Sequence, residues 1–163
     1  MCSIDTHEVL KDEIEYLLNR FRIREIQLKV EISNKNHVVL ANEFLVDVFE
    51  NILINAVKYN NPFGDVTIDI TPVRNNRYKF SIIDTGPGLT QEEQKLLFIP
   101  FSRVGKNVNS VEGTGIGLTI PKRFVELMGG EAGVNSVVGE GATFWFTLQI
   151  FEEGKDATSA MHG

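Results

Sequence analysis

Apolar residues recur with helical spacing in two long stretches of the chain. In residues 5–22 they fall on one side of a helical wheel, at Val9, Leu10, Ile14, Leu17, Leu18 and Phe21. The stretch ANEFLVDVFENILINAVKYN, residues 41–60, repeats with the same period. Asn42 is a typical N-cap for it, and Pro62 disfavours helical backbone at the residue before it. The pattern therefore predicts two amphipathic helices.

Alternation of apolar and polar residues predicts strands elsewhere. These strands are expected at 26–32, 37–41, 65–70, 77–84, 131–138 and 142–150. A short helix capped by Thr90 is expected at 90–97, and a longer one at 116–128 that ends at Gly129-Gly130. Residues 98–114 show no regular pattern.

This order of elements predicts the fold class. Paired strands with helices between them indicate a mixed, mostly antiparallel sheet packed on about three helices, an α/β two-layer sandwich of the α+β kind. A length of 163 residues suits one domain, and a hydrophobic fraction of 42% suits a sizeable core.

Composition restricts the partners and the compartment. A net charge of −6 gives no basic surface for nucleic acid or for direct contact with an anionic membrane. The single cysteine, Cys2, cannot form an internal disulfide, which favours a reducing compartment. No apolar run approaches membrane-spanning length. We expect a cytoplasmic domain, either on its own or as the cytosolic part of a membrane-anchored receptor.

The stretch IIDTGPGL, residues 82–89, has two incompatible interpretations. Asp-Thr-Gly after an apolar strand is typical of the catalytic carboxylate of an aspartic protease. Asp-x-Gly-x-Gly is also how one class of ATP-binding folds begins its nucleotide pocket. Helices dominate the first two-thirds of the chain, and neither Ser nor Ala follows Asp-Thr-Gly. Both observations disfavour the protease.

A polar stripe interrupts the second helix at Asn51, Asn55 and Lys58, spaced i, i+4 and i+7. Asparagine is a poor residue for a helix interior, because its side chain competes for backbone hydrogen bonds. The stripe is either a solvated face or a row of amide oxygens and an ammonium that face a phosphate chain and its Mg²⁺.

Two glycine-rich segments follow. EGTGIGL, residues 112–118, leads into a helix and suits either phosphate binding or a flexible turn; it is neither the G-x-G-x-x-G fingerprint nor a P-loop. GEGATFWF, residues 139–146, is a glycine turn into a strand. Alternation puts Phe144 and Phe146 on one face of that strand, and Thr143 with Trp145 on the other.

Five segments together resemble, in order and spacing, the ATP-binding catalytic domain of sensor histidine kinases, in the GHKL superfamily. That superfamily also holds DNA gyrase, mismatch-repair ATPases and a heat-shock chaperone. The segments are ENILINAVKYN (50–60), DTGPGL (84–89), LFIPFSRV (97–104), GTGIGLTIPKRFVELMGG (113–130) and GEGATFWFTL (139–148). The resemblance covers about residues 5–150 and implies a Bergerat-type ATP-binding fold.

The resemblance also implies roles for individual residues. Asp84 would accept a hydrogen bond from the adenine amine, and Gly86 and Gly88 would let the loop pass under the base. Asn55 would bind Mg²⁺. Further contacts to the nucleotide are implied for Asn51, Lys58, Tyr59, Phe98, Gly113, Thr114, Gly115, Ile116, Gly117, Leu118 and Thr143.

The implied activity is that of an ATP-dependent protein-histidine kinase. Arg103 would reach the γ-phosphate, where positive charge stabilises phosphoryl transfer. ATP-hydrolysing relatives carry a water-activating Glu four residues before the Mg²⁺ asparagine, and this chain has Asn51 there. Glu50, next to it, is the candidate for orienting the acceptor histidine. A serine kinase of the anti-sigma factor type and a non-catalytic nucleotide-sensing module remain alternatives.

Two departures from the family pattern matter. No His-Glu box with a following Pro-Leu is present, so the dimerisation and phosphoacceptor helices would be missing partners, together with a response regulator receiver domain. We expect a linker helix at 1–24 packed on the core, the kinase domain at 25–151 and a flexible tail at 152–163. Pro121 stands where the family usually has an aliphatic residue; it either fixes the start of the helix or tilts the phosphate loop.

Overall fold

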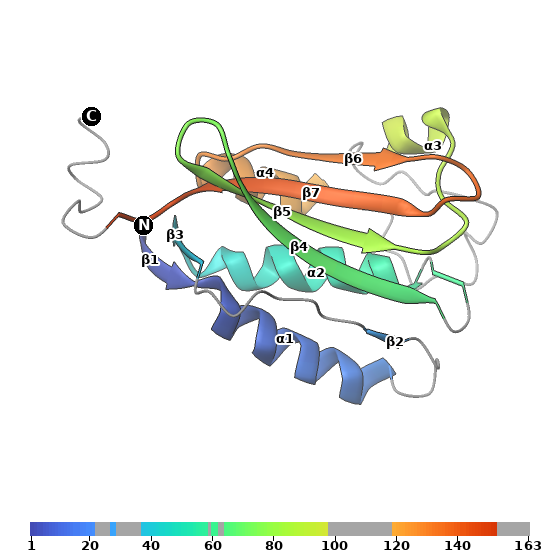
Figure 1. The fold of residues 1–163 in the computed structure, drawn as a ribbon, viewed down its shortest axis with the longest axis horizontal. Coiled ribbons are helices and arrows are strands. Elements are labelled where there is room, and N and C mark those ends of the chain that lie inside the picture. The colour runs from blue at the N-terminus through green and yellow to red at the C-terminus, as the bar shows by residue number, and fades with distance from the viewer. Residues whose placement is uncertain (22–26, 29–36, 59, 62–63, 98–118, 153–163) are drawn as a thin grey trace.

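A computed structural model describes residues 1–21, 27–28, 37–58, 60–61, 64–97 and 119–152 of the chain (Figure 1). The helices are α1 (Thr6–Phe21), α2 (Phe44–Lys58), α3 (Gln91–Leu96) and α4 (Thr119–Leu127). The strands are β1 (Cys2–Asp5), β2 (Gln27–Leu28), β3 (Val38–Ala41), β4 (Asp65–Val73), β5 (Arg77–Asp84), β6 (Ala132–Ser136) and β7 (Ala142–Gln149).

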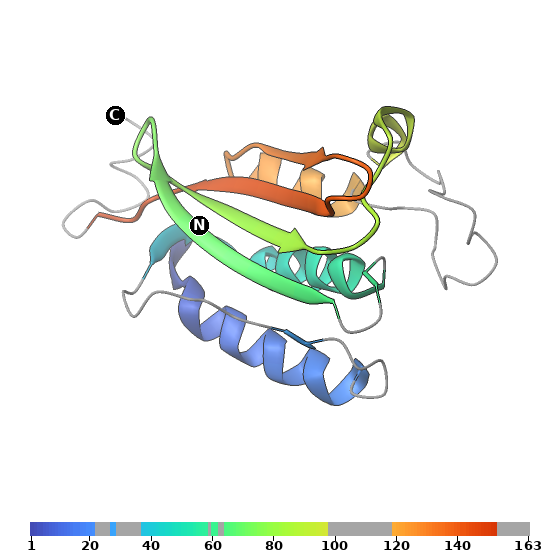
Figure 2. The same cartoon turned by 45° about the vertical axis from the view of Figure 1, so that its right-hand side comes forward.

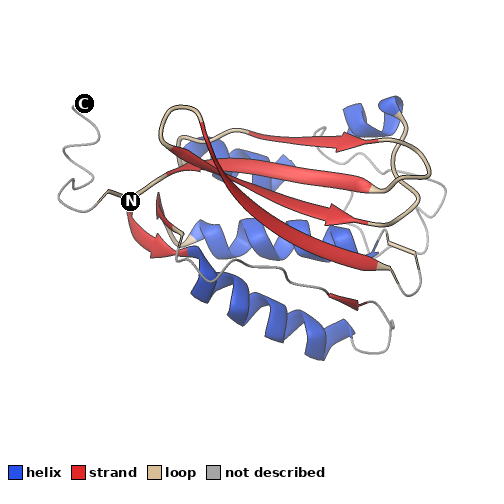
Figure 3. Ribbon diagram, viewed as in Figure 1, coloured by secondary structure: helices blue, strands red, loops and turns tan. Residues whose placement is uncertain are grey.

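Five strands form the main sheet, in the order β2-β4-β5-β7-β6. The pair β2 and β4 is parallel and the other pairs are antiparallel. Helices α2 and α4 pack together on one face of this sheet, and α1 packs beside α2 (Figures 1 and 2). The predicted two-layer α/β sandwich with a mixed, mostly antiparallel sheet is confirmed, as the colouring in Figure 3 makes plain.

The core lies between the sheet and the helices. Three aromatic side chains form its centre: Phe80 stacks on Phe146 with ring centroids 4.9 Å apart, and Phe49 of α2 meets both edge-on. All three are fully buried. Leu10 and Leu17 of α1 belong to the same cluster, so α1 is part of the folded core. The division of the chain at residue 24 stays a prediction.

The predicted helix ends are confirmed where they are described. The Asn42 side chain accepts a hydrogen bond from Phe44 N–H at 2.9 Å. Thr90 and Glu93 form a reciprocal capping box at the start of α3. Gly129 has a φ of 86° and Gly130 N–H donates to Val125 O at 2.9 Å, the Schellman arrangement expected after α4.

One feature of the fold differs from the sequence prediction, and one stays a prediction. Strand β1 was not predicted; it pairs with β3 in a separate two-stranded antiparallel sheet, where Cys2 lies opposite Ala41. Pro121 is the third described residue of α4, and its effect on the residues before Thr119 stays a prediction because they lie outside the described part of the chain.

The long β4–β5 hairpin turns at residues 74–76, where Asn75 and Asn76 both adopt positive φ, which asparagine tolerates well.

Within the described residues, no helix has the length and apolar character needed to cross a membrane.

Candidate functional site

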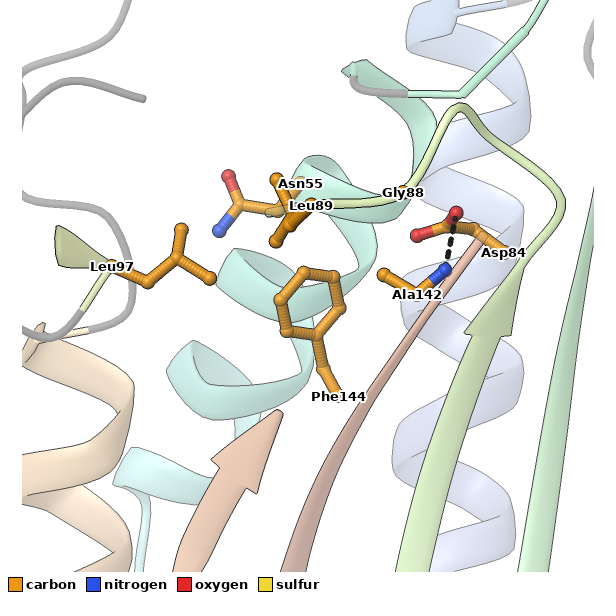
Figure 4. A pocket seen from close by; sticks show the side chains of 7 residues that line it. All are labelled: Asn55, Asp84, Gly88, Leu89, Leu97, Ala142 and Phe144. Atoms are coloured by element: carbon orange, nitrogen blue, oxygen red, sulfur yellow. Dashed lines mark hydrogen bonds between the residues drawn. The ribbon is translucent and has the colours of Figure 1, made fainter. Parts of the chain in front are cut away.

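The candidate site is a pocket at the end of the sheet where β5 finishes and β7 begins. It is a partly open hollow, and the space of about 350 Å³ between its walls includes the open solvent at its mouth. Its lining residues, which converge in Figure 4, are Asn55, Asp84, Gly88, Leu89, Leu97, Ala142 and Phe144.

Asp84 is the charged group of the pocket and is only 3% exposed. Its Oδ1 accepts two backbone hydrogen bonds, from Gly86 N–H at 2.9 Å and from Ala142 N–H at 3.2 Å. Its other carboxylate oxygen points into the pocket (Figure 4). Burial raises the pKa of Asp84 above its ordinary value, while the two backbone hydrogen bonds oppose the rise. The arrangement leaves one acceptor oxygen for a ligand.

The strand order explains why Asp84 sits here. In the antiparallel pairing of β5 with β7, Asp84 lies opposite Ala142, so the last residue of one strand meets the first of the other. Gly141, just before β7, has a φ of 87°, and a Cβ there would run into the backbone carbonyl of Asp84. Glycine is therefore required for the two segments to approach so closely.

Among the described residues, three large apolar side chains also line the pocket. Leu89 lies at the end of the loop 85–89 that follows Asp84, Leu97 follows α3, and Phe144 comes from β7; all three are buried in the core cluster. Gly88 has a φ of 76°, and a Cβ on it would strike the backbone of Val137. A flat, largely apolar ligand with a hydrogen-bond donor on one edge matches this combination of apolar walls and one carboxylate oxygen.

Asn55 brings an amide to the pocket from α2, where it is half-buried. Asn51, one turn earlier, does not line the pocket; its Nδ2 donates to Asp47 O at 2.7 Å, the i−4 bond that polar side chains make within helices. Lys58 is the last residue of α2, and its side chain lies outside the described residues.

Glu50 lies on another side of α2. At 100° per residue it is about 140° around the helix from Asn55. Its charge acts instead on Glu13 of α1: burial raises the pKa of Glu13, and the charges of Glu50, Asp47 and Asp12 raise it further. The structure therefore does not bring Glu50 to the pocket.

Thr143 is not among the residues that line the pocket. Ala142 and Phe144 line it, and adjacent strand residues face opposite sides of the sheet. Ala142 contributes both its methyl group and its backbone N–H to this end of the pocket. Ala142 therefore contributes directly to this end of the pocket, and the role of Thr143 there stays a prediction.

Several predicted site residues lie outside the described part of the chain. They are Tyr59, Phe98, Arg103, Gly113, Thr114, Gly115, Ile116, Gly117 and Leu118. Of the predicted residues that are described, the pocket brings together Asn55, Asp84 and Gly88, and Gly86 lies directly behind Asp84. Leu89, Leu97, Ala142 and Phe144 were not predicted as site residues.

A family model described as "Histidine kinase-, DNA gyrase B-, and HSP90-like ATPase" matches residues 41–151. The chain is 34% identical over 157 residues to the peroxide stress-activated histidine kinase mak2 of Schizosaccharomyces pombe, covering 90% of this chain and 7% of that protein. It is 32% identical over 156 residues to the adaptive-response sensory kinase SasA of Prochlorococcus marinus, covering 94% of this chain and 42% of that protein. The chain thus spans less than half the length of these curated relatives.

Solved structures of histidine kinases are also similar to this chain. A mycobacterial sensor histidine kinase, MprB, aligns with a TM-score of 0.76 at 26% identity, over 91% of this chain and 99% of that one. Full-length ShkA in complex with AMPPNP aligns with a TM-score of 0.76 at 30% identity, over 91% of this chain and 30% of that one.

Proposed function

Because the chain belongs to the family of histidine kinase-, DNA gyrase B- and HSP90-like ATPases, we propose that it is the ATP-binding catalytic domain of a sensor histidine kinase. It transfers the γ-phosphoryl group of Mg-ATP to a histidine on a separate dimerisation domain. The observation that carries the proposal is the pocket of Asp84, where a buried carboxylate offers one oxygen between apolar walls.

Adenine fits this pocket chemically. Its exocyclic amine is a donor, which a carboxylate oxygen accepts, whereas guanine presents a carbonyl oxygen at the corresponding position and would be repelled. Leu89, Leu97 and Phe144 supply the apolar contacts that a base needs on its faces and edges. Gly86 and Gly88 have no side chains, so the loop 85–89 can pass close to the base.

Asn55 is the residue we propose for the metal. Its half-buried amide oxygen is a hard ligand of the kind that Mg²⁺ takes, and one such ligand suffices when phosphates and waters complete the shell. When bound, Mg²⁺ neutralises charge on the phosphate chain. Asn51, one turn from Asn55, is proposed to help orient the phosphates.

The phosphate end of the site is proposed from the family pattern. Lys58 follows Asn55 on α2, Phe98 and Arg103 follow α3, and Arg103 would stabilise charge on the γ-phosphate. At the other end of the nucleotide, Tyr59 would pack beside the adenine and Thr143 would help to close the site. The glycine loop before α4 would line the phosphates with backbone N–H groups, through Gly113, Thr114, Gly115, Ile116, Gly117 and Leu118.

Glu50 is proposed to orient the incoming histidine and not to contact the nucleotide, in keeping with its place on α2 away from Asn55. The partners in this account are the helices that carry the acceptor histidine and, downstream, a response regulator receiver domain.

The proposal is tested by the chemistry of the phosphorylated product. The domain is mixed with labelled Mg-ATP and a separately expressed histidine-bearing dimerisation domain from one of the kinases it resembles. A phosphoramidate on histidine is labile in acid and stable in base, and a serine phosphate ester is stable in acid. Acid-labile label on the partner supports the proposal; acid-stable label would favour the serine kinase, and no transfer despite ATP binding would favour a sensing module.

A further inference from the structure

Three backbone segments meet behind the pocket: the loop 85–89 after Asp84, the short helix α3, and the turn 137–141 between β6 and β7. Sequence reasoning gave no role to the two polar side chains that join them, Ser136 and Gln94. We propose that Ser136 and Gln94 are positioning residues that fix the Asp84 carboxylate for recognition of the base. This inference rests on the proposed function of the pocket.

Ser136, at the end of β6, uses its hydroxyl twice. The oxygen accepts a hydrogen bond from Leu89 N–H at 2.8 Å, and the O–H donates to Gly141 O at 2.6 Å. One hydroxyl that accepts and donates at the same time strengthens both bonds. Ser136 thus ties the wall residue Leu89 to the residue just before Ala142.

Gln94 connects α3 to the same place. Its Nε2 donates to Leu89 O at 3.1 Å and to Ser136 O at 3.0 Å, which uses both amide hydrogens. Leu89 is therefore held at its N–H by Ser136 and at its carbonyl by Gln94. Because α3 leads to Leu97, the other leucine of the pocket, Gln94 also sets the distance between two apolar walls.

Two further hydrogen bonds from backbone N–H groups join the same segments. Gly139 N–H donates to Pro87 O at 2.8 Å, so a hydrogen bond joins the turn 137–141 to the middle of the loop 85–89. At the other end of that turn, Ala142 N–H holds Asp84 Oδ1. A shift of the turn relative to the loop would thus move the donor that orients the carboxylate, and the Ser136 hydroxyl is the side chain that resists this shift.

The test compares ATP with purine riboside triphosphate, which lacks the exocyclic amine, by calorimetry in the presence of Mg²⁺. The native protein is expected to prefer ATP by about tenfold or more, since a hydrogen bond to a charged group is at stake. In Ser136→Ala and in Gln94→Met this preference is expected to fall by about fivefold, whereas affinity for the purine analogue changes little. A purely structural role would weaken both nucleotides alike.

Ser136→Thr keeps the hydroxyl and is expected to restore the preference. Ser81→Ala is the matched control: it removes a hydroxyl from β5 between the buried Phe80 and Ile82, on the opposite face of the sheet, and should leave both affinities unchanged. If Ser136→Ala does not fold, Gln94→Met decides.

An unchanged preference in folded Ser136→Ala or Gln94→Met overturns the positioning role and leaves the proposed function intact. If the native protein binds neither nucleotide, or binds both equally, the proposed function of the pocket fails and the positioning role falls with it.

Discussion

Asp84 combines two properties that oppose each other in the folded protein. Its Oδ1 is held by two backbone N–H groups, yet the side chain is almost fully buried, and burial raises its pKa. Such a carboxylate binds a donor strongly because little water competes for it. It also makes the folded protein without a ligand less stable than an uncharged residue at this position would.

The first prediction is that Asp84 makes the stability of the folded protein depend on pH. A raised folded-state pKa means that, as pH rises above the ordinary Asp value of 3.8, the unfolded chain releases its proton before the folded protein does. Stability is therefore lost as pH rises through the interval between the two pKa values. Asp84→Asn removes this loss and keeps an Oδ1 acceptor. Thermal melts should show that the Tm of the variant minus the Tm of the native protein increases from about pH 4 upward. A difference that decreases with rising pH would rule out this effect of Asp84.

The second prediction concerns Asn55. Asn55→Ala removes the proposed metal ligand, and alanine is a better helix former by about 0.5 kcal/mol. The variant should melt no lower than the native protein, while the difference between its ATP affinity with Mg²⁺ and with EDTA disappears. Asn135→Ala, at an exposed asparagine of β6, is the control and should keep that difference. A full metal requirement in Asn55→Ala would exclude the ligand role.

At the scale of single residues, the sequence predicted the polar side chains Asp84 and Asn55 of the pocket. Its apolar walls, its backbone donor and the polar side chains behind it were not predicted. Asp84 was identifiable because Asp-x-Gly-x-Gly is a recognisable pattern. Ala142 was not, because its contribution is an N–H that every residue except proline carries. Thr85 illustrates the same limit: its hydroxyl accepts from Asp65 N–H at 2.8 Å and ties the start of β4 to the end of β5, a contact that no local pattern predicts.

At the scale of elements, the β6–β7 turn decides the shape of the pocket. Gly139 and Gly141 both have a φ of 87°, a conformation that glycine adopts freely and other residues avoid. They differ in their surroundings: a Cβ on Gly139 meets open space, and a Cβ on Gly141 meets the backbone of Asp84.

The third prediction uses this matched pair. Gly139→Ala should cost about 1 kcal/mol of stability from backbone strain alone and leave ATP affinity unchanged. Gly141→Ala adds a steric conflict, so the loss should reach about 2–4 kcal/mol, and ATP affinity should fall because Asp84 is displaced. Urea unfolding and calorimetry measure the two quantities. Equal effects of the two substitutions on ATP affinity would show that the close approach does not shape the site.

Most elements followed from the sequence because each carries its own local pattern. The capping box of α3 and the glycine end of α4 are examples, since both depend on residues within one turn. Strand β1 was missed for the opposite reason. CSID is four residues long without clear alternation, and its partner β3 lies more than thirty residues further along the chain.

In the whole molecule, strands β1 and β3 lie at the end of the sheet opposite the pocket. Strand β1 pairs with β3, and β3 forms a bridge through Val39 to Ile150, just beyond the end of β7. The pocket lies at the other end of β7, where Ala142 pairs with Asp84. The eight residues of β7 separate the two ends by about 25 Å.

The fourth prediction follows from this separation. Leu10 of α1 is fully buried in the common core, so Leu10→Ala should lower the free energy of unfolding by about 2–5 kcal/mol. The ATP affinity of the molecules that remain folded should not change. Leu127→Ala, at a leucine that is 60% exposed, is the control and should cost less than about 0.5 kcal/mol. A small effect at Leu10 would mean that α1 is a separable linker helix.

Titration calorimetry of Mg-ATP into the native protein and into Asp84→Asn determines whether the Asp84 pocket binds the adenine of ATP. The pH-dependent melts establish beforehand that the variant is folded. We predict binding in the micromolar to millimolar range by the native protein and a loss of about tenfold or more in Asp84→Asn, because the amide presents a donor where the base also presents one. Equal affinity in the two proteins would contradict the account.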